Sequence, residues 1–147
     1  MHRKRRMDII FDIDNTLSDD AHRVHYIQQN SKNWDAYFDA LIDDAPITPT
    51  LEMLRTLYDA RHRIILCTGR PEKYRYLTVQ WLQKYDVPAN ALFMRQPKDG
   101  KLRNAQVKRA MIDRVREANY NPVAVFEDNP SSAAMWKECG LVVYQIA

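Results

Sequence analysis

Two aspartates near the start of the chain stand where a strand is expected to end. Asp12 and Asp14 follow the apolar run Ile9–Phe11 and precede the turn-forming Asn15 and Thr16. Short β-branched runs that end in turn formers are typical of buried strands. Residues two apart leave a strand on the same face, so the two carboxylates should lie side by side. They would repel each other without a cation or a shared proton, and an oxygen-preferring ion such as Mg²⁺ meets that need.

Polar clusters also follow two other expected strands. Thr68–Arg70 comes after the apolar run Arg63–Cys67, and Glu127 and Asp128 come after Pro122–Phe126. In a parallel sheet the carboxyl ends of the strands meet at one edge, and ligands bind beyond that edge. Three strand ends with reactive side chains at one edge therefore predict a single site.

The elements that must position these residues alternate between strand and helix. The expected strands are Met7–Ile13, Arg63–Cys67, Ala91–Met94, Pro122–Phe126 and Leu141–Ile146. The expected helices between them are Thr50–Ala60, Pro71–Tyr85, Asn104–Ala118 and Ser131–Cys139, the last capped by Gly140. This alternation predicts an α/β fold, a Rossmann-like parallel five-stranded sheet with helices on both faces.

The segment between the first two strands, about residues 18–49, is expected to form a small helical cap insert. Two short helices are expected within it, Ser18–Asn30 and Lys32–Asp44. An insert of this size is too short for a large enclosing lid. It would leave the site open to a strand end or to a protein.

Length and composition limit the class of protein. The chain has 147 residues, of which 46% are hydrophobic and 28% charged, so one domain over residues 1–147 is expected. No apolar stretch approaches the roughly 20 residues of a membrane span, and no secretory signal follows the basic N-terminus. Cys67 and Cys139 form no CxxC pair, which favours free thiols in a reducing cytoplasm. The chain also lacks the GxxxxGK[ST] loop of nucleotide-driven kinases.

Basic and aromatic side chains suggest a polyanionic partner without proving one. The net charge is only +3, but basic residues cluster over Arg3–Arg6 and again between Lys98 and Arg109. Such clusters are usually solvated surface, and they are compatible with a nucleic acid. Aromatic residues of the insert could stack on a base, although packing against the core is the favoured interpretation. These aromatic residues are Trp34, Tyr37 and Phe38.

Taken together, the motifs resemble those of the haloacid dehalogenase-like phosphohydrolases. The matching positions, in family order, are Asp12 and Asp14, then Thr68, then Lys108, then Glu127 and Asp128. The closer resemblance is to the 3′-phosphatase domain of phage-type polynucleotide kinase/phosphatase. It rests on TGR at 68–70, FMR at 93–95, VK at 107–108, VAVFED at 123–128, MW at 135–136 and GL at 140–141. It covers nearly all of the chain after the first six residues, which would make residues 1–147 a single phosphatase domain.

The resemblance implies a role for each catalytic candidate. Asp12 would attack phosphorus and form an aspartyl-phosphate. Asp14 would protonate the leaving oxygen and later activate water. Thr68 and Lys108 would hold the phosphoryl oxygens, the lysine as a point charge.

The resemblance also implies a Mg²⁺ cofactor. The ion would bridge Asp12, the backbone carbonyl of Asp14, and Asp128, and Glu127 is a further candidate ligand. There it would shield the attacking carboxylate from the anionic phosphate.

Three residues are candidates for substrate binding. Arg23 and Arg70 occupy the positions of two arginines in the polynucleotide phosphatases, where a guanidinium can grip a phosphate with two hydrogen bonds. Asn104 stands four residues before Lys108, where the phage-type enzymes carry an aspartate. The lost carboxylate would loosen Lys108 or Arg95, so this position bears on the substrate assignment more than on catalysis.

Each candidate also has a purely structural interpretation. Thr68 could cap the helix expected to begin near Pro71, and Lys108 could be a solvated helix residue. Glu127 could belong to a surface turn, and Arg23 to an exposed helix face.

The sequence predicts a Mg²⁺-dependent phosphomonoesterase that removes 3′-phosphates from polynucleotide ends or nucleotides through an aspartyl-phosphate. One alternative is a nucleotidase or general small-molecule phosphatase, and another is a non-catalytic nucleic-acid-binding module. The expected partners are nucleic-acid ends or nucleotides and a separate kinase or ligase, with no membrane. The sequence determines neither the oligomeric state nor a preference for DNA or RNA.

Overall fold

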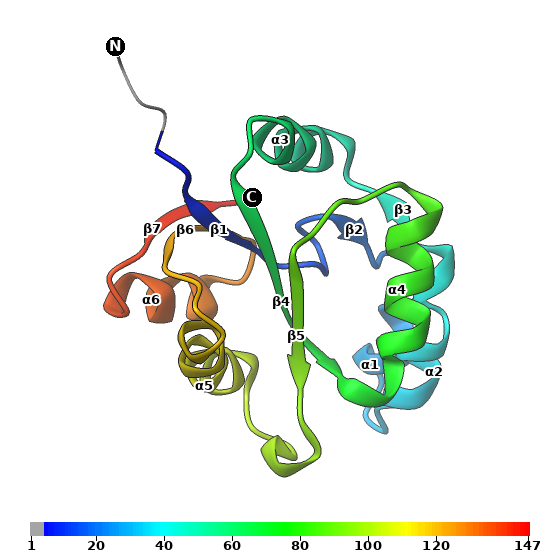
Figure 1. Ribbon diagram of the computed structural model, residues 1–147. Coiled ribbons are helices and arrows are strands. Elements are labelled where there is room, and N and C mark those ends of the chain that lie inside the picture. Colours follow the sequence, from blue (N-terminus) through cyan, green and yellow to red (C-terminus); the bar gives the residue numbers. More distant parts are fainter. Residues whose placement is uncertain (1–4) are drawn as a thin grey trace.

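A five-stranded parallel sheet forms the centre of the molecule in the computed structural model, which describes residues 5–147 (Figure 1). Its strand order is β5-β4-β1-β6-β7, and every neighbouring pair is parallel. The strands are β1 (Asp8–Phe11), β4 (Arg63–Pro71), β5 (Ala91–Arg95), β6 (Pro122–Glu127) and β7 (Val142–Gln145). The predicted α/β sheet is thereby confirmed. Half of the basic cluster at Arg3–Arg6, namely Arg3 and Lys4, lies outside the described residues.

Helices lie on both faces of the sheet. They are α3 (Thr48–Asp59) and α4 (Arg75–Lys84) on one face, and α5 (Asn104–Glu117) and α6 (Pro130–Glu138) on the other (Figure 1). Successive side chains of β1 point to opposite faces. Ile9 and Phe11 therefore join the core under α3 and α4, whereas Ile10 joins the core under α5 and α6. Both faces of β1 are buried, so its carboxyl end is firmly placed.

The insert begins and ends with a two-stranded antiparallel hairpin. Strand β2 (Ser18–Asp19) pairs with β3 (Ala45–Pro46). Between them lie α1 (His25–Gln28), α2 (Trp34–Asp39) and the 3₁₀ turn η1 (Leu41–Asp43). The predicted helix over residues 18–30 is wrong except for α1. The two ends of the insert have to meet beside the sheet, and their backbone groups pair there with each other.

Strand β4 is longer than predicted. The sequence predicted a strand that ends at Cys67 and a helix from Pro71, but β4 continues to Pro71. A 3₁₀ turn, η2 (Glu72–Tyr74), then precedes α4. A residue before proline is restricted to extended backbone, which keeps Arg70 in the strand. Thr68 and Arg70 are therefore held by the sheet and not by a loop.

Two smaller predictions concern the later helices. Helix α5 begins at Asn104, as predicted. Gly140 has a φ of 90° just after α6, which confirms it as the residue that ends this helix. Among residues 5–147, none of the helices has both the length and the apolar character that a bilayer crossing needs.

Candidate active site

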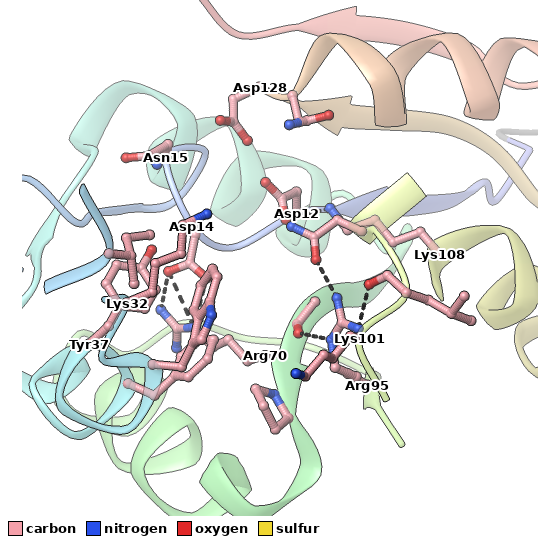
Figure 2. Close-up of a pocket in the computed structure, with 18 of the residues that line it drawn as sticks. Asp12, Asp14, Asn15, Lys32, Tyr37, Arg70, Arg95, Lys101, Lys108 and Asp128 are labelled. Carbon is pink, nitrogen blue, oxygen red and sulfur yellow. Dashed lines mark hydrogen bonds and ion pairs between the residues drawn. The ribbon is translucent and has the colours of Figure 1, made fainter. Parts of the chain in front are cut away.

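A cavity of about 620 Å³ lies at the carboxyl edge of the sheet. Asp12 and Asp14, which follow β1, line it, together with Arg70 of β4. Glu127 and Asp128, at the end of β6, complete this edge (Figure 2). Residues of the insert and of the segment before α5 form the remaining walls. The structure thus brings together the three strand ends that the sequence placed at one site.

Lys108 of α5 joins two of the carboxylates. Its Nζ donates to Asp12 Oδ1 at 2.9 Å and to Glu127 Oε1 at 2.7 Å. Burial alone would lower the pKa of Lys108, but Asp12 and Glu127 outweigh it and raise the pKa. The side chain is 2% exposed and stays charged. The alternative of a solvated helix residue is therefore excluded for Lys108.

Glu127 is fixed by neutral donors as well as by Lys108. Trp136 Nε1 of α6 donates to Glu127 Oε1 at 3.1 Å, and the backbone N–H of Asn129 donates to Oε2 at 3.3 Å. Glu127 is completely buried, so the interpretation as a surface turn residue is wrong. Its carboxylate holds the Lys108 ammonium in place beside Asp12.

Thr16 connects the aspartates at the end of β1 and β6. Its hydroxyl donates to Asp12 Oδ2 at 3.1 Å, and Asp128 Oδ1 lies 3.4 Å from Thr16 Oγ1. The preceding Asn15 takes a φ of 62°, the left-handed turn geometry that asparagine tolerates better than most residues. Thr16 completes the pattern Asp-x-Asp-x-Thr (DxDxT) at 12–16, and the sequence predicted it only as a turn former.

Three carboxylates are close enough to share a cation. Oxygen atoms of Asp12, Glu127 and Asp128 all lie within 4.8 Å of one another. Burial and the neighbouring Asp12 raise the pKa values of Glu127 and Asp128, because an unneutralised carboxylate cluster resists ionisation. Oxygen ligands of this kind suit Mg²⁺. Glu127 already accepts three hydrogen bonds, so Asp12 and Asp128 have more capacity to bind an ion.

Asp14 is separate from this carboxylate cluster, because it is bound by two arginines. Arg70 donates to Asp14 through Nη2 at 2.8 Å and Nε at 3.1 Å, and Arg23 Nη2 donates at 2.6 Å. Burial would raise the pKa of Asp14, but Arg70 and Arg23 outweigh it and lower the pKa to about 2. At neutral pH the side chain of Asp14 is therefore a carboxylate.

Both arginines are themselves fixed from behind. Arg23 donates to Asp44 Oδ1 at 2.7 Å and to Oδ2 at 2.8 Å. Arg70 donates to the hydroxyl groups of Thr78 and Ser18, each at 3.2 Å. Both guanidinium groups are buried, so the alternative of an exposed helix arginine is wrong for Arg23. Their substrate contacts stay a prediction, since in the structure both arginines bind Asp14.

Sequence reasoning missed Asp44 altogether. This aspartate is completely buried at the end of η1, whereas the adjacent Asp43 is exposed. It also contacts His22 Nε2 at 2.7 Å, and its backbone carbonyl accepts from Trp81 Nε1 at 2.9 Å. In the sequence, Asp43 and Asp44 are adjacent and precede Ala45 and Pro46, and nothing in this pattern indicates which of the two aspartates is buried.

Thr68 does not cap a helix. Its hydroxyl accepts the backbone N–H of Arg70 at 3.1 Å, whereas α4 begins only at Arg75, without a side-chain cap. Thr68 is completely buried, and it is absent from the cavity lining within the described residues. Its contact with phosphoryl oxygens stays a prediction.

Asn104 holds Arg95 and not Lys108. Arg95 Nη2 donates to Asn104 Oδ1 at 2.8 Å, and Arg95 Nε donates to the carbonyl of Gly69 at 2.9 Å (Figure 2). A Cβ atom on Gly69 would lie 2.2 Å from Asn104 Oδ1, so a larger residue at position 69 would displace the Asn104 side chain that binds Arg95. The amide oxygen of Asn104 thus accepts from Arg95 at the position where the phage-type enzymes carry an aspartate.

The aromatic residues of α2 do not share one environment. Tyr37 and Phe38 are buried in the core, as the favoured interpretation predicted. Trp34, the first residue of α2, packs on Tyr37 and Phe38 but is 48% exposed and lines the cavity.

The geometry can be compared with known proteins. Residues 6–147 match the family model described as the polynucleotide kinase PNKP phosphatase domain. The chain belongs to this family. It is therefore a phosphatase domain of the haloacid dehalogenase type, and the resemblance stated from its motifs is confirmed.

Among the relatives of this phosphatase domain is a protein of Autographa californica nuclear polyhedrosis virus described as a bifunctional polynucleotide kinase/RNA ligase. The two are 28% identical over 131 residues, which is 88% of this chain and 18% of the viral protein. The domain thus spans less than a fifth of that relative.

Solved structures show the same fold. A chain in the structure of the Pnkp1/Rnl/Hen1 RNA repair complex has a TM-score of 0.79 at 22% identity, over 96% of this domain and 42% of that chain. A class C acid phosphatase from Bacillus anthracis with tungstate bound has a TM-score of 0.63 at 16% identity. That match covers 88% of this domain and 54% of the acid phosphatase chain.

Proposed function

We propose that this phosphatase domain is a Mg²⁺-dependent phosphomonoesterase that removes the 3′-phosphate from a polynucleotide end through an aspartyl-phosphate. The observation that carries the proposal is the pairing of Asp12 with a buried lysine beside Asp14 at the mouth of a cavity. Lys108 Nζ lies 2.9 Å from Asp12 Oδ1, while Asp14 is held separately by arginines. Two carboxylates in different environments can take different roles in one reaction.

In the first half of the proposed reaction, a carboxylate oxygen of Asp12 attacks phosphorus. The new P–O bond forms while the bond to the 3′ oxygen of the sugar breaks. The hydroxyl of Thr16 and the ammonium of Lys108 fix the rotamer of Asp12. The same ammonium is close enough to stabilise the charge on the phosphoryl oxygens in the transition state.

Asp14 handles the protons in this proposal. Arg70 and Arg23 keep it ionised in the free domain, with a pKa of about 2. An arriving phosphate dianion adds negative charge beside Asp14 and competes for Arg70, which raises the pKa of Asp14. Asp14 can then protonate the leaving oxygen, and as a carboxylate it accepts a proton from the water that hydrolyses the aspartyl-phosphate.

Asp12 and Asp128 are the residues that we expect to hold Mg²⁺, with the backbone carbonyl of Asp14 as a third ligand. The mutual distances of at most 4.8 Å among the carboxylates Asp12, Glu127 and Asp128 support this assignment. When bound, the ion supplies charge neutralisation between the nucleophile and the anionic phosphate.

A polynucleotide end as substrate, and a kinase or ligase as partner, are proposed from the relatives. The family model is that of a polynucleotide kinase phosphatase domain, and the viral relative is described as a kinase/RNA ligase. The domain covers only 18% of the viral protein and 42% of the chain in the RNA repair complex. We therefore propose that residues 1–147, with the cap insert over residues 18–49, act as one domain beside a kinase or ligase activity.

The proposal can be tested with oligonucleotides that differ only in the position of the phosphate. We expect phosphate release from the 3′-phosphorylated strand with Mg²⁺, little release from the 5′-phosphorylated strand, and none in excess chelator. Asp12→Asn should abolish turnover because the amide is a poor nucleophile, whereas Asp113→Asn, an exposed carboxylate of α5, should not. Equal rates on both strands would favour a general phosphatase. Full activity of Asp12→Asn would exclude the aspartyl-phosphate.

A further inference from the structure

Trp34 is held rigidly although it is exposed. It is 48% exposed, whereas Trp81 and Trp136 are completely buried. The indole packs on Tyr37 and Phe38, with ring centroids 5.8 and 5.9 Å away. Because those two rings belong to the core, they fix the orientation of the indole while about half of its surface faces solvent. An aromatic face that is pre-oriented in this way loses little entropy when it binds a flat partner.

The same ring borders the catalytic cavity. Trp34 and Phe38 line the cavity that also contains Asp12 and Lys108. A cavity of about 620 Å³ falls in the range of roughly 300–1,000 Å³ typical of sites that enclose small organic ligands. A phosphate group at Asp12 would fill only part of it. The remaining space, bounded by Trp34, can receive the nucleoside that carries the phosphate.

Two lysines add positive charge to the walls of the cavity. Lys32 comes from the insert and Lys101 from the segment before α5, and Figure 2 shows Lys101 on the side of Arg95. Within residues 5–147 neither lysine forms an ion pair, whereas Arg70 and Lys108 are both paired with carboxylates. Lys32 contacts the Trp34 ring, with Nζ 5.8 Å from the ring centroid. Because neither lysine is paired with a carboxylate of the described residues, both charges can attract a bound anion, that of Lys32 beside the indole.

We propose that Trp34 is a stacking platform for the terminal nucleobase of the substrate strand. Lys32 and Lys101 attract the internucleotide phosphate next to that nucleoside. This proposal rests on the 3′-phosphatase activity proposed above. A nucleobase can stack on an indole only when it is not paired and stacked in a duplex. The substrate is therefore an unpaired 3′ end. Aromatic stacking combined with lysine contacts tolerates every base, so the end is bound without sequence preference.

The kinetic test compares three substrates. They are a 3′-phosphorylated oligonucleotide, the same strand without its terminal base, and a small alkyl phosphate, which has no ring to stack. Trp34→Ala should lower kcat/KM about 5- to 150-fold on the intact strand, the range expected when one base–aromatic stack is lost. It should leave the other two substrates nearly unchanged, and Trp34→Phe should restore most of the loss. Tyr76→Ala is the matched control, because Tyr76 of α4 is 72% exposed and does not line the cavity.

A binding measurement gives an answer that does not depend on turnover. In the Asp12→Asn variant, acrylamide should quench mainly Trp34, since Trp81 and Trp136 are buried. An intact unpaired strand should protect this fluorescence, whereas the strand without its terminal base should not. Protection by neither strand, or an equal loss of kcat/KM on all three substrates, would overturn the stacking proposal. Failure to hydrolyse the 3′-phosphate would instead contradict the proposed function, whatever the fluorescence shows.

Discussion

At the scale of single residues, the two aspartates of the DxDxT motif have separate sets of partners. Asp12 contacts Lys108 and a threonine hydroxyl, whereas Asp14 contacts Arg23 and Arg70. The motif predicted both aspartates and their common edge. It could not predict Asp44, because the contact between Asp44 and Arg23 joins residues 21 positions apart and depends on how the insert folds.

Asp44 should act as a positioning residue for Asp14 through Arg23. In Asp44→Asn the buried guanidinium loses half of its paired charge, and removing one partner of a buried pair costs up to about 3–5 kcal/mol. We expect a lower free energy of unfolding in urea and a fall in kcat that exceeds the change in KM. Asp43→Asn is the matched control, since Asp43 is exposed. If the two variants behave alike, Asp44 has no such role.

At the scale of elements, the end of β4 lies close to the start of α5, where Gly69 faces the side chain of Asn104. A Cβ atom on Gly69 would lie 2.2 Å from Asn104 Oδ1, and both residues bind Arg95. The glycine of the TGR motif therefore leaves the space that the Asn104 side chain occupies while it binds Arg95.

Gly69→Ala should consequently displace Asn104 and Arg95. Overpacking of this kind typically costs about 1–3 kcal/mol in the free energy of unfolding. The double variant Gly69→Ala/Asn104→Ala should lose less than the sum of the two single variants, because the shortened side chain makes room. Urea unfolding of all four proteins measures this coupling, and strict additivity would mean that the two residues do not compete for space.

The sequence predicted the elements with strong periodicity and missed those without it. Strands β5, β6 and β7 and helix α5 were placed within one residue of their observed bounds, whereas β4 continues four residues past its predicted end. Strands β2 and β3 have two residues each, too few to show an alternation. The exposure of Trp34 was missed because helical spacing indicates which residues share a face, but not which residue at the end of a helix stays open to solvent; only Tyr37 and Phe38 of α2 are buried.

At the scale of the whole molecule, negative charge gathers at the carboxyl edge of the sheet. Carboxylate oxygens of Asp12, Glu127 and Asp128 lie within 4.8 Å of one another, and Lys108 contacts only the first two. Asp12 follows β1, and Glu127 and Asp128 lie at the end of the neighbouring strand β6, so the pairing of these two strands brings the acids together. A cation that binds the folded chain and not the unfolded chain would relieve their repulsion.

Mg²⁺ should therefore stabilise the fold. At 100 times its Kd, an ion that binds only the folded state adds about 2.7 kcal/mol to the free energy of unfolding. Asp128→Asn should abolish this gain without destabilising the metal-free protein, because burial and Asp12 raise the pKa of Asp128 and already favour its uncharged form, which the amide resembles. Thermal melts with and without Mg²⁺ measure both effects, and Asp113→Asn should respond like the wild-type chain. A gain that survives in Asp128→Asn would place the ion elsewhere.

The hairpin of β2 and β3 fixes the two ends of the insert next to each other. Ser18 pairs with Pro46, and the backbone N–H of Ile47 donates to the carbonyl of Leu17 at 2.7 Å, so the chain leaves and rejoins the sheet at one place. A segment of another length grafted there would have to keep the core contacts of Tyr37, Phe38 and Leu41. It would also have to preserve the Arg23–Asp44 pair, which joins the insert to Asp14 at the edge of the sheet.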